Sequence, residues 1–180
     1  MRRRRLGSQG PELSVIGFGA MEVGETEGWD DRPSDDVLVD VIRSALDAGI
    51  NWIDTAEVYG DGNSERLVGE ALAGGLFGPH LPSEEELRAT LGERAWARRG
   101  PAVLDLLRAI HPMAERAAMS VPQLALAWTL EHPGVTSPIV GSTNPEHIRE
   151  AAEAGDVGLD DADLTELNAL VERVRDAVGV

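Results

Sequence analysis

The chain has 180 residues and a formal net charge of −16, and all 16 of its basic residues are arginines. This length suits one domain, and an apolar fraction of 42% permits a buried core. The absence of cysteine excludes disulfides and thiolate chemistry, and the absence of lysine excludes Schiff bases and a lysine general base. The excess of 32 acidic over 16 basic residues argues against nucleic acid as a partner.

Neither a membrane span nor a signal peptide is expected. No apolar run approaches the ~20 residues that a transmembrane helix needs. The basic run Arg2–Arg5 is followed by glycines and polar residues instead of the apolar segment of a signal peptide. We therefore expect a soluble, cytoplasmic protein with no membrane partner. The arginine run is read as a solvated end, with an arm that binds a partner as the alternative.

The first part of the chain predicts alternating strands and helices. A hairpin is expected over residues 6–14, and a short buried strand over 13–19. A serine-capped helix follows over 34–48, because its apolar residues recur at three- and four-residue spacing and a glycine follows it. Residues 50–53 predict a second strand, and Ser64 is expected to cap the next helix.

A glycine-rich break near residue 74 interrupts this pattern. Irregular helices are expected from there to Gly100. Pro101 is expected to open a helix that Pro112 kinks or ends. Ser120 and Gln123 have the spacing of a capping box ahead of a helix over 124–131.

The last part of the chain repeats the alternation. Residues 136–140 predict a third strand, Asn144 caps and Pro145 starts a helix, and two aspartates, Asp160 and Asp163, open the last helix. Strand followed by helix is typical of α/β proteins with parallel strands. No internal repeat is found.

Three polar or glycine-rich clusters each follow a predicted strand. They are Gly17–Met21, Asp54–Glu65 and Gly141–His147. In parallel α/β proteins, ligands bind at the carboxyl ends of the strands. We therefore expect these clusters to form one site.

At these residues the sequence resembles the aldo-keto reductases, (β/α)8 barrels that reduce carbonyl compounds with NADPH. The resemblance covers residues 3–75 and about 101–175. The stretches that carry it are Arg5–Gly7, Ser14–Met21, Ala48–Ala56 with Tyr59, Gly60, Ser64 and Glu65, Gln123–Trp128 and Pro133–Ser142.

The resemblance also implies that part of the barrel is missing. A complete barrel of this kind needs about 250 residues, with about 200 as the lower end. We predict the α/β fold of a partial (β/α)8 TIM barrel, a single truncated domain over 1–180 that keeps strands one, two and eight. Its N-terminal part is 1–75, its irregular junction 76–100 and its C-terminal part 101–180. Strands eight, one and two are neighbours in a closed barrel, so the remnant has two open edges that invite self-association or a partner chain.

The family's active site uses an aspartate, a tyrosine, a lysine and a histidine, of which Asp54 and Tyr59 match the first two. There is no lysine, and the histidines lie outside the family's context: His80, His111, His132 and His147. A tyrosine with an ordinary pKa of about 10 is a poor acid at neutral pH, and the family's lysine lowers that pKa. A positioned general acid contributes ~10² to 10⁴ in rate.

Residues on the cofactor side survive in part. The resemblance implies NADPH or NADH as cofactor; Asn144 is neutral and His147 replaces the usual arginine, so the preference stays open. Trp29 lies where the family often places a substrate-facing aromatic, with surface packing as the alternative. No metal site is expected. The cofactor-binding candidates are Gly19, Ala20, Met21, Asp54, Gly141, Ser142, Thr143, Asn144 and His147.

The resulting functional prediction is an oxidoreductase that reduces a small aldehyde or ketone by hydride transfer. We expect its activity to be impaired or absent in the isolated chain, because the lysine and histidine are lacking. The alternatives are a non-catalytic cofactor-binding or interaction module, and the remnant of a deleted reductase gene.

Overall fold

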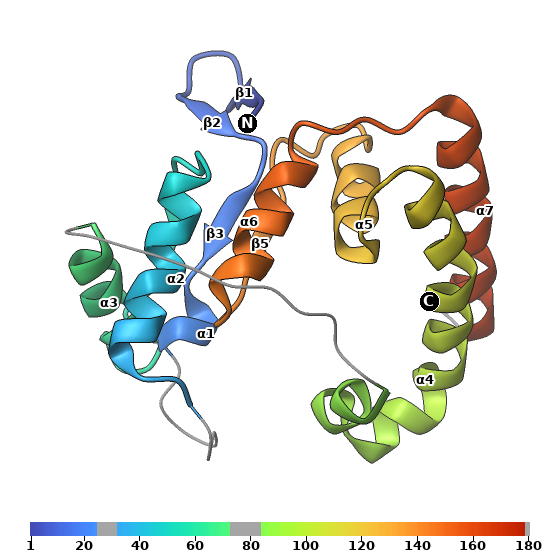
Figure 1. Ribbon diagram of the computed structural model, residues 1–180, viewed down its shortest axis with the longest axis horizontal. Helices are drawn as coiled ribbons and strands as arrows, with labels where there is room; N and C mark the ends of the chain where they lie inside the picture. The colour runs from blue at the N-terminus through green and yellow to red at the C-terminus, as the bar shows by residue number, and fades with distance from the viewer. Residues whose placement is uncertain (25–31, 73–83, 179–180) are drawn as a thin grey trace. The chain divides into compact units, whose positions relative to one another are not determined.

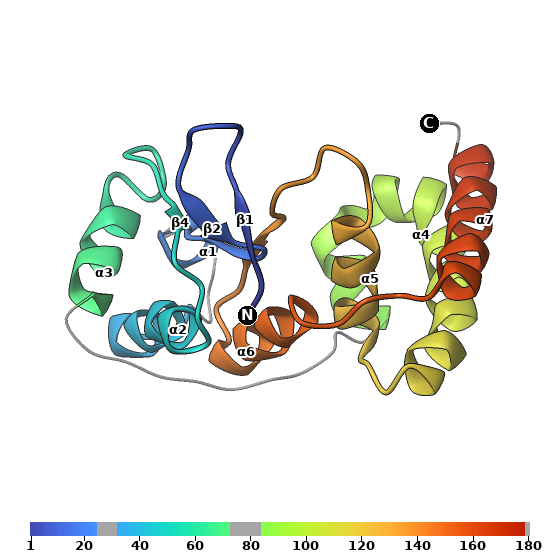
Figure 2. The same cartoon turned by 90° about the horizontal axis from the view of Figure 1, so that it is seen from above.

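A computed structural model describes residues 1–24, 32–72 and 84–178, the stretch 84–99 by its backbone alone. The contacts divide the chain into two compact units. The first unit combines residues 1–80 with 129–157, and the second combines 81–128 with 158–180. The first unit therefore contains residues from both of the segments that resemble the family, whereas the second contains residues from the later segment alone. Figures 1 and 2 show the elements in two views.

A parallel sheet of three strands forms the centre of the first unit. Its strands are β3 (Gly17–Gly19), β4 (Ile53–Asp54) and β5 (Ile139–Gly141), in the order β4-β3-β5. This is the order two, one, eight that the resemblance implies. β3 is fully buried, whereas β4 and β5 each pair on one side only within the described chain. The fold is thus α/β with a partial sheet, and no closed barrel is formed by the described residues.

An antiparallel hairpin precedes this sheet, formed by β1 (Arg3–Arg5) and β2 (Glu12–Ser14). The expected hairpin is confirmed, although its strands begin earlier than predicted. The backbone continues through the buried residues Val15 and Ile16 into β3. The single strand expected over 13–19 is therefore two short strands, divided where the chain passes from the hairpin to the parallel sheet.

The arginine run is the expected solvated end only in part, because Arg2, Arg3 and Arg5 are exposed but Arg2 and Arg4 also form hydrogen bonds with the fold. The Arg2 side chain donates to the carbonyls of Gly155 and Val157 at 2.6 and 2.8 Å. The Arg4 guanidinium donates to the carbonyls of Val135 and Leu130 at 2.8 and 3.0 Å. The arginines between and after them are exposed, because neighbouring residues of an extended chain point to opposite sides. Arg2 and Arg4 thus satisfy carbonyls at helix ends and in loops, and Arg5 donates to the carbonyl of Gly10 within the hairpin at 3.2 Å.

Four helices complete the first unit: α1 (Met21–Gly24), α2 (Asp35–Asp47), α3 (Asn63–Ala71) and α6 (Pro145–Ala154). α2 contacts both α3 and α6, and α2 and α6 lie together beside the strands (Figures 1 and 2). The predicted apolar face of α2 is buried: Leu38, Val41, Ile42 and Ala45. Burial of this face stabilises the helix, since Ser34 is its N-cap but makes no side-chain capping bond.

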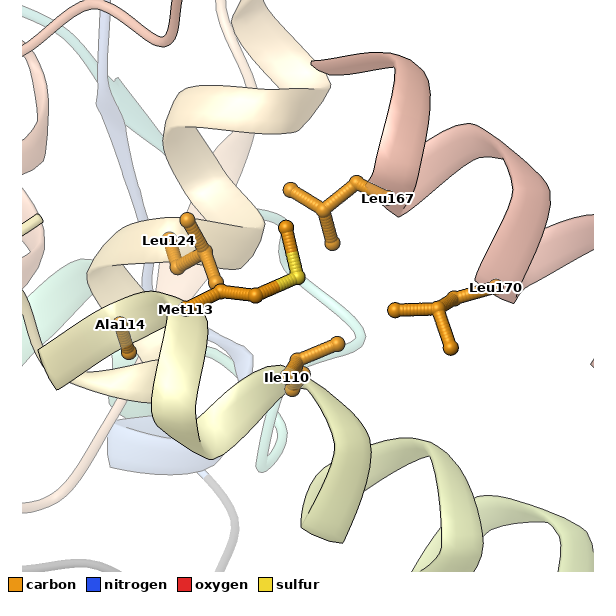
Figure 3. Packing of buried hydrophobic residues seen from close by; sticks show 6 residues of the cluster. All are labelled: Ile110, Met113, Ala114, Leu124, Leu167 and Leu170. Carbon is orange, nitrogen blue, oxygen red and sulfur yellow. The ribbon is translucent and has the colours of Figure 1, made fainter. Parts of the chain in front are cut away.

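The second unit is helical, with α4 (Glu84–Arg116), most of α5 (Val121–Leu130) and α7 (Asp161–Val178). Side chains from these three helices converge in one apolar cluster (Figure 3). Trp128 adds a hydrogen bond from Nε1 to Oδ1 of Asn168 at 2.8 Å. The residues of the cluster are Ile110, Met113, Ala114, Leu124, Leu167 and Leu170.

Two expectations for this unit were wrong. Pro101 does not open a helix, because it lies inside α4. Pro112 also lies inside α4, so of its two expected effects the end of the helix is excluded and a kink stays a prediction. A proline removes one intrahelical hydrogen bond but does not have to end a helix that packs well elsewhere. α5 begins at Val121, three residues earlier than expected, because Ser120 and Gln123 form the reciprocal capping box itself. No described helix is both long and apolar enough to cross a membrane.

Candidate active site

Three predicted site residues lie in one row across the parallel sheet. Gly19, at the end of β3, pairs in register with Asp54 of β4 on one side and with Gly141 of β5 on the other. These are the last residues of their strands. The carboxyl ends of the strands therefore meet at one edge, as the three clusters in the sequence predict.

Tyr59 reaches Asp54 across the loop that follows β4. Its hydroxyl donates to Oδ2 of Asp54, with 3.4 Å between the oxygens. Both side chains are half-buried. At this distance the hydrogen bond is long, so Asp54 orients the phenol weakly.

The backbone around Tyr59 is fixed by a tight turn. Its N–H donates to the carbonyl of Ala56 at 3.0 Å, and its own carbonyl accepts from the N–H of Ser64 at 3.2 Å. Gly60 follows with φ of +61°, and a Cβ there would overlap the backbone carbonyl of Gly24. The close approach of α1 thus requires glycine at this position.

Ser64 connects the ends of two strands, a role that the sequence analysis did not predict. Its hydroxyl donates to the carbonyl of Ala20 at 2.7 Å and lies 2.8 Å from the hydroxyl of Thr55. The side chain is fully buried. Ser64 is not the expected helix cap, since α3 is capped by Gly62. Its position directly after a glycine-rich loop was the only signal of this role.

The loop after β5 is organised around its own polar side chains. The hydroxyl of Ser142 accepts from the N–H of Asn144 at 3.0 Å and lies 3.3 Å from Nδ1 of His147. Asn144 caps α6 by accepting from the N–H of Glu146 at 3.1 Å, as predicted. Thr143 lies between them and is half-buried. The structure thus brings Ser142, Asn144 and His147 together at the start of α6.

The remaining candidates occupy the start of α1. Ala20 is fully buried and its N–H donates to the carbonyl of Asp54 at 2.9 Å, whereas the Met21 side chain is 52% exposed. Trp29 lies outside the described residues. Among the described residues, no three histidine, aspartate or glutamate side chains are grouped in a way that could hold a metal ion.

Glu22 also lies at this edge, and sequence reasoning missed it. A Cβ built on Gly141 would overlap the Glu22 carboxylate. A Cβ on Gly19 would lie 2.9 Å from a methyl group of Ile139. The close approach of Ile139 thus restricts a side chain at Gly19, whereas at Gly141 only the far end of the flexible Glu22 side chain would have to move.

Asp35, at the start of α2, has a shifted pKa because it forms ion pairs with arginines. A hydrogen bond from Arg32, with a second from Arg66 and the charge of both guanidinium groups, holds the pKa of Asp35 below its ordinary value. The Arg32 contact is 2.9 Å long. Asp35 is the first residue of α2, where the helix dipole also favours a negative charge.

Comparison with known proteins identifies the family. The sequence profile of the aldo/keto reductase family matches residues 15–88 and 76–172. These two segments together span most of the chain, which therefore belongs to the aldo/keto reductase family. The two matches meet within residues 76–88, at the predicted junction.

Curated relatives match only part of their own length. An NADH-specific methylglyoxal reductase of Escherichia coli is 35% identical over 100 residues, which is 56% of this chain and 29% of that protein. A probable aldo-keto reductase of Glycine max is 44% identical over 68 residues, or 38% of this chain and 19% of that protein. The chain thus spans less than a third of the length of these relatives.

Solved structures show the same fold at low sequence identity. A thermostable aldo-keto reductase in complex with the inhibitor epalrestat has a TM-score of 0.67 at 20% identity, with 94% of this chain and 100% of that chain covered. An aldo/keto reductase from Klebsiella pneumoniae in complex with NADP and acetate has a TM-score of 0.66 at 21% identity, with 94% and 95% covered. The predicted partial (β/α)8 architecture is thereby confirmed.

Proposed function

We propose that this chain binds NADPH or NADH at the carboxyl edge of the sheet and reduces a small aldehyde or ketone slowly, with Tyr59 as the proton donor. The observation that carries the proposal is the contact between Tyr59 and Asp54 beside the row of strand ends. Family membership, the NADP complex of a structural neighbour and the NADH-specific reductase among the relatives support it.

The loop after β5 offers several groups that can bind the phosphates of a dinucleotide. Ser142 supplies a hydroxyl, His147 an imidazole and the start of α6 a positive helix end. Helix starts of this kind bind phosphate groups through backbone N–H donors and the helix dipole. Gly141, Thr143 and Asn144 complete the loop that would hold the pyrophosphate. Gly19, Ala20 and Met21 would lie toward the ribose and nicotinamide.

Bound at this edge, the nicotinamide supplies a hydride to the carbonyl carbon. The chain's own contribution is a proton from the hydroxyl of Tyr59 to the carbonyl oxygen. Asp54 acts on that hydroxyl as a positioning residue, because its carboxylate accepts the phenolic hydrogen when no substrate is present.

The proposed rate is low because the chain contains no lysine. In the family, a lysine ammonium makes the tyrosine a stronger acid. Since general acid catalysis contributes ~10² to 10⁴ in rate, we place turnover below that of a complete family member by up to this factor.

The test is oxidation of NADPH or NADH by the purified chain in the presence of small aldehydes and ketones. Tyr59→Phe removes one oxygen and should lower kcat by at least about tenfold, with little change in the Kd for the cofactor. Glu57→Gln is the matched control, because Glu57 is exposed in the same loop and should leave kcat unchanged. Equal turnover by Tyr59→Phe and the parent would contradict the role of Tyr59.

The missing lysine favours one second candidate, a module that binds the cofactor without catalysis. The same preparation separates the two candidates. Cofactor binding by calorimetry together with no substrate-dependent oxidation would support the module. Turnover that depends on Tyr59 would exclude it.

A further inference from the structure

A carboxylate lies beside the loop that is proposed to bind phosphate. Glu22, in the short helix α1, places its carboxyl group against Gly141, the last residue of β5. Gly141 directly precedes Ser142, which begins the loop proposed to hold the pyrophosphate. An acidic side chain therefore lies at the entrance of a site for an anion.

The fold fixes the backbone position of Glu22 beside the loop. Val23, the next residue, is fully buried, and the N–H of Gly24 donates to the carbonyl of Ala20 at 3.2 Å. A Cβ on Gly24 would lie 2.5 Å from the Cβ of Ser64. Since α1 is packed this closely, only rotation of the Glu22 side chain can move the charge.

The charge of Glu22 is also not offset nearby. Among the described side chains, which leave out those of residues 84–99, no arginine forms an ion pair with it. A half-buried charge without an opposite partner acts on a neighbouring ligand with little screening.

We infer that Glu22 limits the affinity for the cofactor, because it weakens binding of the pyrophosphate of a dinucleotide. The inference rests on the proposed cofactor site. The negative charge of the Glu22 carboxylate repels the negative charge of the phosphates. The chain therefore binds NADH and NADPH more weakly than the loop after β5 alone would allow. Repulsion between two unit charges about 4 Å apart in bulk water corresponds to about fivefold in Kd, and to more in a half-buried site.

The test measures the Kd of NADH and of ADP-ribose by calorimetry at low salt, for the full chain and for Glu22→Gln. ADP-ribose carries the pyrophosphate without the nicotinamide ring. We expect Glu22→Gln to bind both at least about fivefold more tightly, and the gain to shrink as salt is added. Glu57→Gln is the control, because it removes the same charge from an exposed position. Its Kd should change by less than about twofold.

The outcomes separate this inference from the proposed function. Equal gains in Glu22→Gln and Glu57→Gln would show an effect of net charge and overturn the inference. Unchanged or weaker binding by Glu22→Gln would also overturn it, while binding by the parent chain would leave the proposed cofactor site intact. No binding by the parent or by either variant would overturn both. If Glu22→Gln does not melt like the parent, Glu22→Ala takes its place.

Discussion

Three glycines near the candidate proton donor provide a graded test of the structure. Gly60 and Gly62 both have positive φ, +61° and +85°. A Cβ on Gly60 would overlap the backbone carbonyl of Gly24, whereas a Cβ on Gly62 would meet no atom within 4 Å. Gly69 lies inside α3 with no contact within 4 Å of its Cβ position. Substitution of each by alanine should therefore have a different effect.

The expected magnitudes follow from these surroundings. An L residue in the left-handed region costs about 1 to 2 kcal/mol relative to glycine, so Gly62→Ala should lose about that amount. Gly60→Ala has the same cost plus the backbone shift that relieves the overlap, a further 1 to 3 kcal/mol or so. Gly69→Ala should gain about 0.5 to 1 kcal/mol, since alanine is the better residue in a helix interior.

Urea unfolding followed by circular dichroism measures the three differences in the free energy of unfolding. Because the chain has two compact units, hydrogen exchange of the Phe18 amide in β3 provides a second, local reading from the first unit. A Gly60→Ala variant no less stable than Gly62→Ala would refute the close packing of α1 on the turn that holds Tyr59.

Two further predictions concern ion pairs and hydrogen bonds of the first unit. Arg4→Ala should lower the free energy of unfolding by about 1 to 3 kcal/mol, because it leaves two half-buried carbonyls without a donor. Arg3→Ala, at an exposed position, should change it by less than about 0.5 kcal/mol. Equal losses for the two variants in urea titrations would argue against this difference between Arg4 and Arg3. The pKa of Asp35 is lowered in the folded state, so its contribution is present above the unfolded value of 3.8 and is lost as the pH falls through the lower folded value. The stability difference between the parent and Asp35→Asn should thus be constant from neutral pH to about pH 5 and shrink below pH 3.8; a difference that grows in acid would contradict the sign.

Local signals in the sequence predicted much of the first unit. The apolar spacing of α2 predicted the helix and its buried face, since one stripe of side chains has only one way to face the core. Asn144 followed by proline predicted the start of α6, because cap and first turn are both determined by neighbouring residues. The reciprocal bonds of Ser120 and Gln123 are of the same local kind.

Features that depend on distant residues could not be predicted in this way. Ser64 has a cap-like residue type, but its partners are the carbonyl of Ala20 and the hydroxyl of Thr55, which only the fold brings near. In the sequence, Glu22 is one acidic residue among many, and only the fold brings its carboxylate next to Gly141 of β5. Pro101 marks a helix start in isolation, yet lies inside a helix whose packing supplies the stability that its missing N–H costs.

The order of the sheet explains how a chain of this length can keep an edge for ligands. The family profile matches residues 15–88 and 76–172, and the first strand of the sheet comes from the first match and β5 from the second. A closed barrel joins its last strand to its first, so β5 pairs with β3 in parallel even though more than 100 residues separate them. The two halves of the candidate site, Asp54 with Tyr59 and the loop from Gly141, thus flank the same central strand. Loss of the intervening strands would leave β4, β3 and β5 side by side but would remove the lysine that assists proton donation in the family. We therefore expect cofactor binding to persist better than turnover.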